Sequence, residues 1–374
     1  MKNKINILFV CDDLNFIISH RLHILKKLLE LNYNIIILYR IGSLKSLHDL
    51  EALNILCIES RLNNFKFTYL YYSLSDIRLL IRKHEIHIVH AITIKNSFFS
   101  LLAMRKYKST PLVMSISGLG TLFIEKRLYL LRIITSSLFR ALAKRNNKRF
   151  FIFQNSEDIR DLLGSEPAQY YHTIIRGSGV DLKLYDKQSY YPEVVNFVFA
   201  GRLTVQKGFR DFVDLAKKIQ RRTKEVKFTV FGDIHPSNPS SITLNELNKH
   251  IGDGDIVYGG FRSDIENIFL NEVSCLILTS EREGFPKSVI DAAAAGKPSI
   301  VYNVAGSRDS VEHGVTGVIV EKSDTCMMQK VVLDFIENPG LIEKMGQSAK
   351  VKATKEFDIS SVIRGHLTVY EEVI

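Results

Sequence analysis

Short apolar runs rich in β-branched residues alternate with helical patterns along the whole chain, and this alternation restricts the fold more than any other feature. The expected strands are 5–10, 35–40, 86–91, 111–116 and 150–155 in the first half, and 196–201, 227–232, 255–260, 274–280, 297–303 and 316–321 in the second. Continuous apolar runs are typical of strands that helices cover on both faces. The sequence therefore predicts an α/β fold with doubly wound parallel sheets.

The chain has 374 residues, which exceeds what one hydrophobic core usually supports. Residues 181–195 lack a clear period and contain a proline, so we expect one Rossmann-like domain at 1–185 and a second at 186–374. The closing helix, about 359–372, can pack on either domain. Ligands of open parallel sheets bind beyond the carboxyl ends of the strands, so the cleft between two facing domains is the expected active site.

The first helix and the composition complete this outline. A helix is expected from about His20 to Leu31, with Ser19 as its N-cap. The four cysteines form no CxxC pair, so neither a zinc site nor a disulfide framework is predicted. No apolar run reaches the roughly 18 residues of a membrane span, and the first residues are typical of a strand rather than a signal peptide. We therefore expect a cytoplasmic protein.

Positive charge is concentrated in the first half of the chain. Residues 1–185 contain 27 Lys and Arg against 14 Asp and Glu, a net +13, and the remainder contains 23 against 26, a net −3. Residues 126–149 hold eight basic residues and no acid, and Arg132, Arg140 and Lys144 are interleaved with Leu128, Leu131, Ile134, Leu138 and Leu142 at helical spacing. Such helices bind anionic membrane surfaces.

Two other interpretations of the basic segment are open. The leucines can be core residues with the charges on a solvated face, and nucleic acid is a further partner for a basic surface. No recognition-helix, zinc-finger or aromatic RNA-binding motif occurs in the sequence, so we expect an anionic membrane surface and no nucleic acid as partners.

Two cations follow the expected strand 196–201. Arg202 and Lys207 lie in the loop before the next helix, next to Gly208. Cations at the carboxyl end of a strand, close to a helix N-terminus, are typical of a diphosphate site. The alternative is ordinary solvated surface charge.

Two carboxylates, Glu283 and Asp291, are separated by seven residues in the segment 280–298, which follows the expected strand 274–280. Pro286 suits the first turn of a helix, and the amides of the next two residues then lie at its positively polarised end. Ionised carboxylates accept hydrogen bonds from vicinal hydroxyls, as in the acid that binds a ribose in dinucleotide-binding folds. The alternative is a capping acid followed by a solvated helix acid.

Three segments, 177–186, 199–213 and 280–324, resemble the signature segments of the large retaining family of GT-B glycosyltransferases usually called family 4. Several independent motifs occur in the order typical of that family, and the resemblance covers nearly the whole chain. It implies a GT-B fold, with two Rossmann-like domains facing across a cleft. It also implies a nucleotide-diphosphate sugar, expected to be a UDP-sugar, as substrate, with no cofactor and no metal.

The resemblance also implies roles for single residues. Arg202 and Lys207 match the arginine and lysine that bind the donor diphosphate. Glu283 matches the first acid of the family's E-x7-E motif, which contacts the donor sugar, and Asp291 matches the second, which binds the nucleoside ribose, although it is one methylene shorter. We therefore predict Arg202, Lys207 and Glu283 as catalytic. The predicted donor-binding positions are Gly284, Phe285, Pro286, Lys287, Ser288 and Asp291.

The first domain departs from the family pattern. No glycine-rich loop follows its first strand, and Ser117 stands where a histidine often precedes the loop glycine. The "SHRL" and "GLG" forms resemble the branch that elongates lipid-linked bacterial surface polysaccharides, such as O-antigen or capsule. A lipid-linked glycan acceptor and a peripheral position on the inner face of the plasma membrane are therefore expected. The acceptor-site candidates are His20, His90, Gly118 and Gly120.

Retaining sugar transfer is the predicted reaction. The diphosphate leaves, cations and helix amides stabilise its developing charge, and the acceptor hydroxyl attacks from the side that the leaving group vacates. The alternatives are a nucleotide-sugar epimerase or phosphorylase on the same fold, or a catalytically idle binding subunit. No motif for a proton-abstracting pair or a pyridoxal cofactor is found, and intact Arg202, Lys207 and Glu283 oppose an idle subunit.

Overall fold

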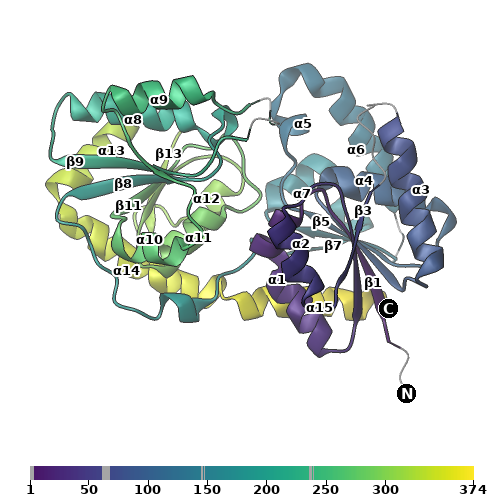
Figure 1. Ribbon diagram of the computed structural model, residues 1–374. Helices are drawn as coiled ribbons and strands as arrows, with labels where there is room; N and C mark the ends of the chain where they lie inside the picture. The colour runs from purple at the N-terminus through teal and green to yellow at the C-terminus, as the bar shows by residue number, and fades with distance from the viewer. Residues whose placement is uncertain (1–3, 61–67, 145, 147, 236–237, 239) are drawn as a thin grey trace. The chain divides into compact units, whose positions relative to one another are not determined.

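The computed structural model describes residues 4–60, 68–144, 146, 148–235, 238 and 240–374 (Figure 1). It also leaves the side chains of 68–72, 121 and 126 undescribed. The chain forms two compact units, residues 1–178 with 360–374, and residues 179–359. The division falls earlier than position 185 because Val180 and Tyr185 are buried in a core of the second unit.

The first unit is a seven-stranded parallel sheet in the order β3-β2-β1-β4-β5-β6-β7. Its strands are β1 Asn6–Val10, β2 Asn34–Tyr39, β3 Leu56–Glu59, β4 Ile88–Ile92, β5 Leu112–Ile116, β6 Arg149–Phe153 and β7 Tyr171–Ile174. Its helices are α1 Leu14–Glu30, α2 Leu44–Glu51, α3 Thr68–Lys83, α4 Ile94–Ala103, α5 Thr121–Ile124, α6 Tyr129–Ala143, α7 Ser156–Leu163 and α15 Ile359–Val373. The closing helix α15 thus packs on the first unit.

Alternate residues of the first sheet enter two cores on its opposite faces. Ile7 and Phe9 of β1 pack with α1, α2 and α15 on one face. Leu8 and Val10 pack with α3, α4, α6 and α7 on the other. Both faces are therefore covered, as the apolar runs in the sequence require (Figure 1).

The second unit is a six-stranded parallel sheet in the order β10-β9-β8-β11-β12-β13. Its strands are β8 Val195–Ala200, β9 Val226–Phe231, β10 Val257–Gly260, β11 Cys275–Leu278, β12 Ser299–Tyr302 and β13 Gly317–Val320. Its helices are α8 Phe209–Gln220, α9 Leu244–Gly252, α10 Ile265–Asn271, α11 Lys287–Ala294, α12 Ser307–Ser310, α13 Thr325–Glu337 and α14 Pro339–Glu356. Both sheets are Rossmann-like, because the strand order reverses beside the first strand of each unit.

The first helix begins earlier than the sequence predicts. Asp13 is its N-cap, and the Asp13 side chain accepts a hydrogen bond from the Asn15 amide at 2.8 Å. The expected N-cap, Ser19, lies inside α1, where its hydroxyl donates to the Asn15 carbonyl at 2.8 Å. The prediction of a start at His20 is wrong because an aspartate caps a helix as well as a serine does. No helix in the described part of the chain has the length and apolar character of a membrane span.

Candidate active site

The loops that carry the predicted catalytic residues meet at the switch point of the second sheet. β8 lies next to β11, and their following loops contain Arg202 with Lys207 and Glu283, respectively. The Thr279 hydroxyl donates to the Gly208 carbonyl at 2.8 Å, which ties the two loops together. Gly208 has a φ of 79°, and a Cβ there would lie 2.1 Å from the Thr279 carbonyl oxygen. A glycine is therefore required for this close approach.

Lys207 and Glu283 form an ion pair across this junction. The Lys207 ammonium lies 2.6 and 2.8 Å from the two carboxylate oxygens of Glu283. The Glu283 side chain is only 10% exposed, so water screens the pair weakly. The Glu283 amide donates to the Ala305 carbonyl at 3.1 Å, and Gly306, with a φ of 76°, allows that loop to approach. The two residues to which the sequence gives separate roles are thus in contact.

Asp291 is buried, not solvated. It lies on α11, whose N-cap is Pro286, and it is 4% exposed. One carboxylate oxygen accepts hydrogen bonds from the Lys287 ammonium at 2.5 Å and from the Tyr185 hydroxyl at 3.1 Å. Burial and the Asp291 carboxylate raise the pKa of Tyr185 well above its usual range. A buried carboxylate with a cation and a hydroxyl beside it excludes the interpretation of Asp291 as a solvated helix acid.

A cavity of about 250 Å³ opens at the carboxyl ends of the strands in the second unit. Arg202, Lys287, Ser288 and Asp291, all predicted from the sequence, line it. The other lining residues are Ala200, Gly201, Phe231, Gly232, Asp233, His235, Phe261, Arg262, Ile265 and Phe269. A largely apolar wall with a few charged groups is typical of sites that bind small molecules.

Three predicted donor-binding residues do not line this cavity. Gly284, Phe285 and Pro286 are buried. The Phe285 ring packs edge-on against Phe357, with 5.5 Å between ring centroids, in the core that also contains α11. The Phe285 side chain therefore belongs to the core, and the donor-binding role of this residue stays a prediction.

Besides the buried Phe231 and Phe269, four polar or aromatic residues of the cavity were not predicted from the sequence, namely Asp233, His235, Phe261 and Arg262. Each lies within four residues of the end of β9 or β10, so its position after an expected strand is the signal that could have identified it. Phe261 is 73% exposed, and Arg262 forms an ion pair with Asp264 and lies 3.7 Å from Glu272. Hydrogen bonds from Arg262 lower the pKa of Asp264 to about 2.

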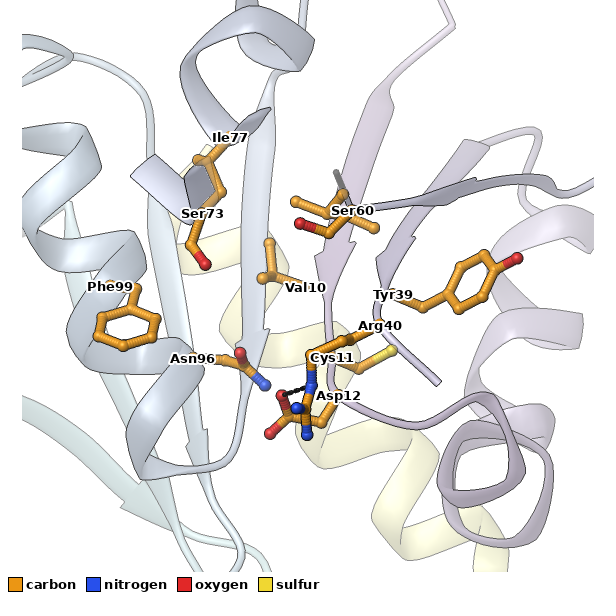
Figure 2. A pocket seen from close by; sticks show the side chains of 11 residues that line it. Val10, Cys11, Asp12, Tyr39, Arg40, Ser60, Ser73, Ile77, Asn96 and Phe99 are labelled. Carbon is orange, nitrogen blue, oxygen red and sulfur yellow. Dashed lines mark ion pairs between the residues drawn. The ribbon is translucent and has the colours of Figure 1, made fainter. Parts of the chain in front are cut away.

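The first unit has its own pocket at the corresponding switch point, between β1 and β4 (Figure 2). Its volume is about 20 Å³. Asp12, directly after β1, forms ion pairs with Lys95 at 2.7 Å and with Arg40 at 3.4 Å. The pocket is also lined by Arg40 and by nine other residues, namely Val10, Cys11, Leu38, Tyr39, Ser60, Ser73, Ile77, Asn96 and Phe99. Burial and the neighbouring aspartates raise the pKa of the Cys11 thiol, so this cysteine is not a reactive thiolate.

Two acceptor-site candidates, His20 and His90, lie in regular elements of the first unit, and the prediction for His20 stays a prediction. His20 is within α1, half-buried, and its ring stacks on Phe16 with 4.3 Å between centroids. His90 is fully buried in β4, with its ring nitrogens 2.6 Å from the Tyr370 hydroxyl and 2.7 Å from the Ser115 hydroxyl. Burial lowers the pKa of His90 well below its usual range. His90 is therefore a core residue, and its prediction as an acceptor-site residue is wrong.

The glycine candidates remain accessible in the loop after β5. Gly118 is half-buried and Gly120 is exposed. The Arg21 guanidinium, itself 2% exposed, lies 3.5 Å from the Ser117 hydroxyl of this loop. Burial lowers the pKa of Arg21 to about 10, a value at which it still carries its charge at neutral pH. A buried cation therefore lies behind the loop.

The basic segment differs from its predicted form. Arg149 is buried and donates to backbone carbonyls, including that of Thr110 at 2.9 Å, and the Lys148 ammonium donates to the Val373 carbonyl at 2.7 Å. These two cations are structural. Lys126 and Arg145 lie outside the described side chains. Lys144 is exposed, Arg132 and Arg140 are half-buried, and Leu131, Ile134 and Leu138 are exposed. Those three apolar residues are therefore not core residues.

Among the described residues, no group of three or more His, Cys, Asp or Glu side chains could hold a metal ion. The expectation that no metal takes part is a statement from the sequence and stays a prediction.

Comparison with known proteins follows this division into two units. Residues 6–155 match the family model "Glycosyl transferase 4-like", and residues 186–352 match "Glycosyl transferases group 1". The N,N'-diacetylbacillosaminyl-diphospho-undecaprenol alpha-1,3-N-acetylgalactosaminyltransferase of Campylobacter jejuni is 22% identical over 310 residues, 79% of each chain. The capsular polysaccharide biosynthesis glycosyltransferase CapM of Staphylococcus aureus is 28% identical over 173 residues, 43% of this chain and 42% of CapM.

Solved structures share the fold over nearly the whole chain. The structure of Anabaena Alr3699/HepE in complex with UDP and glucose superimposes with a TM-score of 0.76 and 17% identity, covering 98% of this chain and 99% of that one. At this identity the likeness concerns the fold alone, which is the GT-B fold of two Rossmann-like domains.

Proposed function

Because the chain belongs to the GT-B glycosyltransferases of the family 4 type, we propose that it transfers a sugar, with retention of configuration, from a UDP-sugar to a lipid-linked glycan. The observation that carries the proposal is the cavity at the switch point of the second sheet, where Arg202, Lys287 and Asp291 meet. The acceptor belongs to bacterial surface polysaccharide synthesis, as O-antigen or capsule, in this proposal. The Campylobacter relative, whose name gives a diphospho-undecaprenol acceptor, supports it.

The donor nucleotide occupies the 250 Å³ cavity in this proposal. The exposed Phe261 ring offers a flat apolar surface for the base, and the buried Asp291 carboxylate accepts hydrogen bonds from the ribose hydroxyls. Arg202, at the end of β8, binds the diphosphate, because a guanidinium matches phosphate oxygens with two parallel hydrogen bonds. Lys207 follows in the same loop, and its ammonium pairs with Glu283.

Charge stabilisation is the main chemical task of these residues. When the bond between the sugar and the diphosphate breaks, negative charge grows on the diphosphate, and Arg202 and Lys207 stabilise it. The Lys207–Glu283 ion pair holds the ammonium and a carboxylate at fixed positions, so little reorganisation is needed during the reaction. The carboxylate of Glu283 then orients the sugar. The acceptor hydroxyl attacks the anomeric carbon on the side that the diphosphate leaves, and its proton passes to the departing diphosphate.

The acceptor side belongs to the first unit in this proposal. The loop with Gly118 and Gly120 follows β5, and the polar pocket around Asp12 lies at the switch point of the first sheet (Figure 2). Helix α6 presents exposed apolar residues on this unit, which supports a peripheral position on an anionic membrane surface, on the cytoplasmic side. An epimerase, a phosphorylase or an idle binding subunit remains the alternative.

A transfer assay separates these possibilities. The purified chain is incubated with radiolabelled UDP-sugars and a diphospho-prenol-linked acceptor, and the lipid phase is counted. We expect label from one UDP-sugar to enter the lipid phase, with the anomeric configuration of the donor preserved in the product by NMR. Release of an epimerised nucleotide sugar would support the epimerase instead. UDP binding without any turnover would support the idle subunit.

A further inference from the structure

Helix α6 turns an apolar face outward. Leu130, Leu131, Ile133, Ile134 and Leu138 are between 40% and 73% exposed. Their spacing places them on one side of the helix, and the buried Ser136, Phe139 and Ala143 lie on the other. An outward face of five large apolar side chains is unusual for a surface helix of a globular protein.

A groove of about 280 Å³ lies beside this face, between α6 and α7. Three guanidiniums line it, those of Arg132, Arg140 and Arg160, together with one carboxylate, that of Asp161. The other lining residues are Phe123, Tyr129, Ile133 and Ser136. The groove is therefore strongly cationic, with a net excess of positive charge and aromatic walls.

The arginines of the groove are held in place. The Arg132 guanidinium stacks over the Tyr129 ring at 5.0 Å and the Phe123 ring at 5.7 Å. The Arg140 guanidinium donates to the Ser137 hydroxyl at 3.3 Å. Stacking on aromatic rings fixes a guanidinium while leaving its N–H groups available for an anion.

A buried hydroxyl of the groove also has no partner. Ser136 is 4% exposed, and its oxygen makes no hydrogen bond to any residue that the structure describes. Buried polar atoms are nearly always hydrogen-bonded. A ligand in the groove can therefore supply the hydrogen-bond partner that the Ser136 hydroxyl lacks. This observation is independent of the charge count.

We propose that the groove binds the terminal phosphate of a membrane lipid whose chains lie against the outward face of α6. A phosphate accepts paired hydrogen bonds from guanidiniums, and the adjoining apolar side chains match a hydrocarbon chain. The same apolar face argues against a nucleic acid, which offers phosphates without hydrocarbon. The inference goes beyond the proposed function, because a lipid with a terminal phosphate is a membrane anchor and not the acceptor, whose diphosphate lies between the lipid and the glycan.

The test compares two double variants with equal loss of charge. Arg132→Gln with Arg160→Gln removes two cations from the groove. Arg127→Gln with Lys144→Gln removes two exposed cations that flank α6 outside it. Vesicles of phosphatidylcholine contain either phosphatidic acid, with a terminal phosphate, or phosphatidylglycerol, adjusted to the same surface potential. Binding is measured by co-sedimentation.

We expect the wild-type protein to bind phosphatidic acid vesicles roughly tenfold more tightly than phosphatidylglycerol vesicles, since paired arginine contacts add to the general attraction. The groove variant should lose this preference. The flanking variant should bind both vesicles more weakly by the same factor and keep the preference. Equal preference in wild type and groove variant would overturn the proposal.

Two further measurements separate the sources of phosphate and other occupants. Leu130→Ser with Ile134→Ser should lose vesicle binding but still bind inorganic phosphate in calorimetry with UDP present at saturation, which fills the donor site. This is expected if the groove binds phosphate and the apolar face binds lipid. If this variant instead converts a dimer to a monomer in the absence of lipid, the face is an interface between copies and the proposal is wrong. UDP binding is measured for every variant, so failure of the donor site is detected separately.

Discussion

The two sheets have the same strand order around the first strand of each unit, yet their switch points differ in content. In the second unit the strand ends enclose a cavity of about 250 Å³ with the exposed Arg202 on its wall. In the first unit the pocket is about 20 Å³, and its Asp12 is already paired with Arg40 and Lys95. Topology thus determines where a site can lie, and the side chains after the strands decide what it binds.

Buried ionisable groups differ between the units as well. The first unit buries His90 and His366 near the Arg21 cation, and burial holds the pKa of both histidines below the usual range, that of His366 at about 3. The second unit buries Lys297, whose ammonium donates to the Tyr190 carbonyl at 2.6 Å and lies 3.7 Å from the centroid of the Tyr191 ring. Burial lowers the pKa of Lys297 to about 7.

The largest expected effect concerns the cations of the second switch point. Arg202→Ala or Lys207→Ala should lower sugar transfer by roughly 10²–10³, the range for loss of one group that stabilises developing charge. Arg210→Ala is the matched control, since Arg210 lies nearby on α8 and pairs with Glu246 at the surface. Turnover of the purified variants is the measurement. If Arg202→Ala turned over at the wild-type rate, the strand ends of the second unit would no longer be distinguished from those of the first by a catalytic cation.

The next effect concerns nucleotide affinity. Asp291→Asn should weaken UDP binding by roughly 10- to 100-fold, because a hydrogen bond to a charged group contributes about 1.5–3 kcal/mol. Calorimetry with UDP measures it, and circular dichroism checks that α11 is intact. Unchanged affinity would leave Asp291 as a structural acid held by Lys287 and Tyr185.

A pH dependence of stability should come from Lys297. Its pKa is about 7 in the folded chain, whereas an unfolded lysine has a pKa of about 10.4. Between these values the unfolded chain binds one more proton, so this group makes the free energy of unfolding of the second unit rise with pH, by up to ~1.4 kcal/mol per unit. Lys297→Met should remove this contribution, and the exposed Lys355→Met should not. Urea unfolding at pH 7 and pH 9 gives the change in the free energy of unfolding with pH for each protein. An equal change for wild type and Lys297→Met would contradict the account.

The smallest effect concerns the hydroxyl beside Asp291. Tyr185→Phe removes the 3.1 Å hydrogen bond and leaves the ring in its core. We expect UDP affinity to fall only about fivefold, since one such bond contributes about 1 kcal/mol. A loss as large as that of Asp291→Asn would mean that Tyr185, rather than the carboxylate, binds the ribose.

The strands show how much of the fold can be predicted from the sequence alone. All six strands of the second unit and five of the first lie within a few residues of the predicted runs. β3 and β7 were missed because each has only four residues, with side chains that are exposed or half-buried, at the two edges of the first sheet. A short strand of this kind gives a weaker signal than one that is buried on both faces.

The site was predicted in part, for a similar reason. Arg202, Lys287, Ser288 and Asp291 line one cavity because the strand order brings their loops together, which follows from the alternation of strands and helices. The Lys207–Glu283 ion pair joins residues 76 positions apart and depends on the packing of two loops. Likewise, the burial of the Phe285 side chain depends on its contact with Phe357, which is distant in the sequence. Such contacts cannot be read from local spacing.

The most direct test of the division between the units is UDP binding by two matched arginine variants. Arg202 lines the cavity at the strand ends of the second sheet, and Arg40 lines the pocket at the strand ends of the first. Calorimetry should show that Arg202→Ala weakens UDP binding about tenfold or more, since an arginine–phosphate contact is charge-assisted, and that Arg40→Ala leaves it unchanged. Undiminished UDP binding by Arg202→Ala, with loss of binding in Arg40→Ala, would place the nucleotide on the first unit and contradict the account.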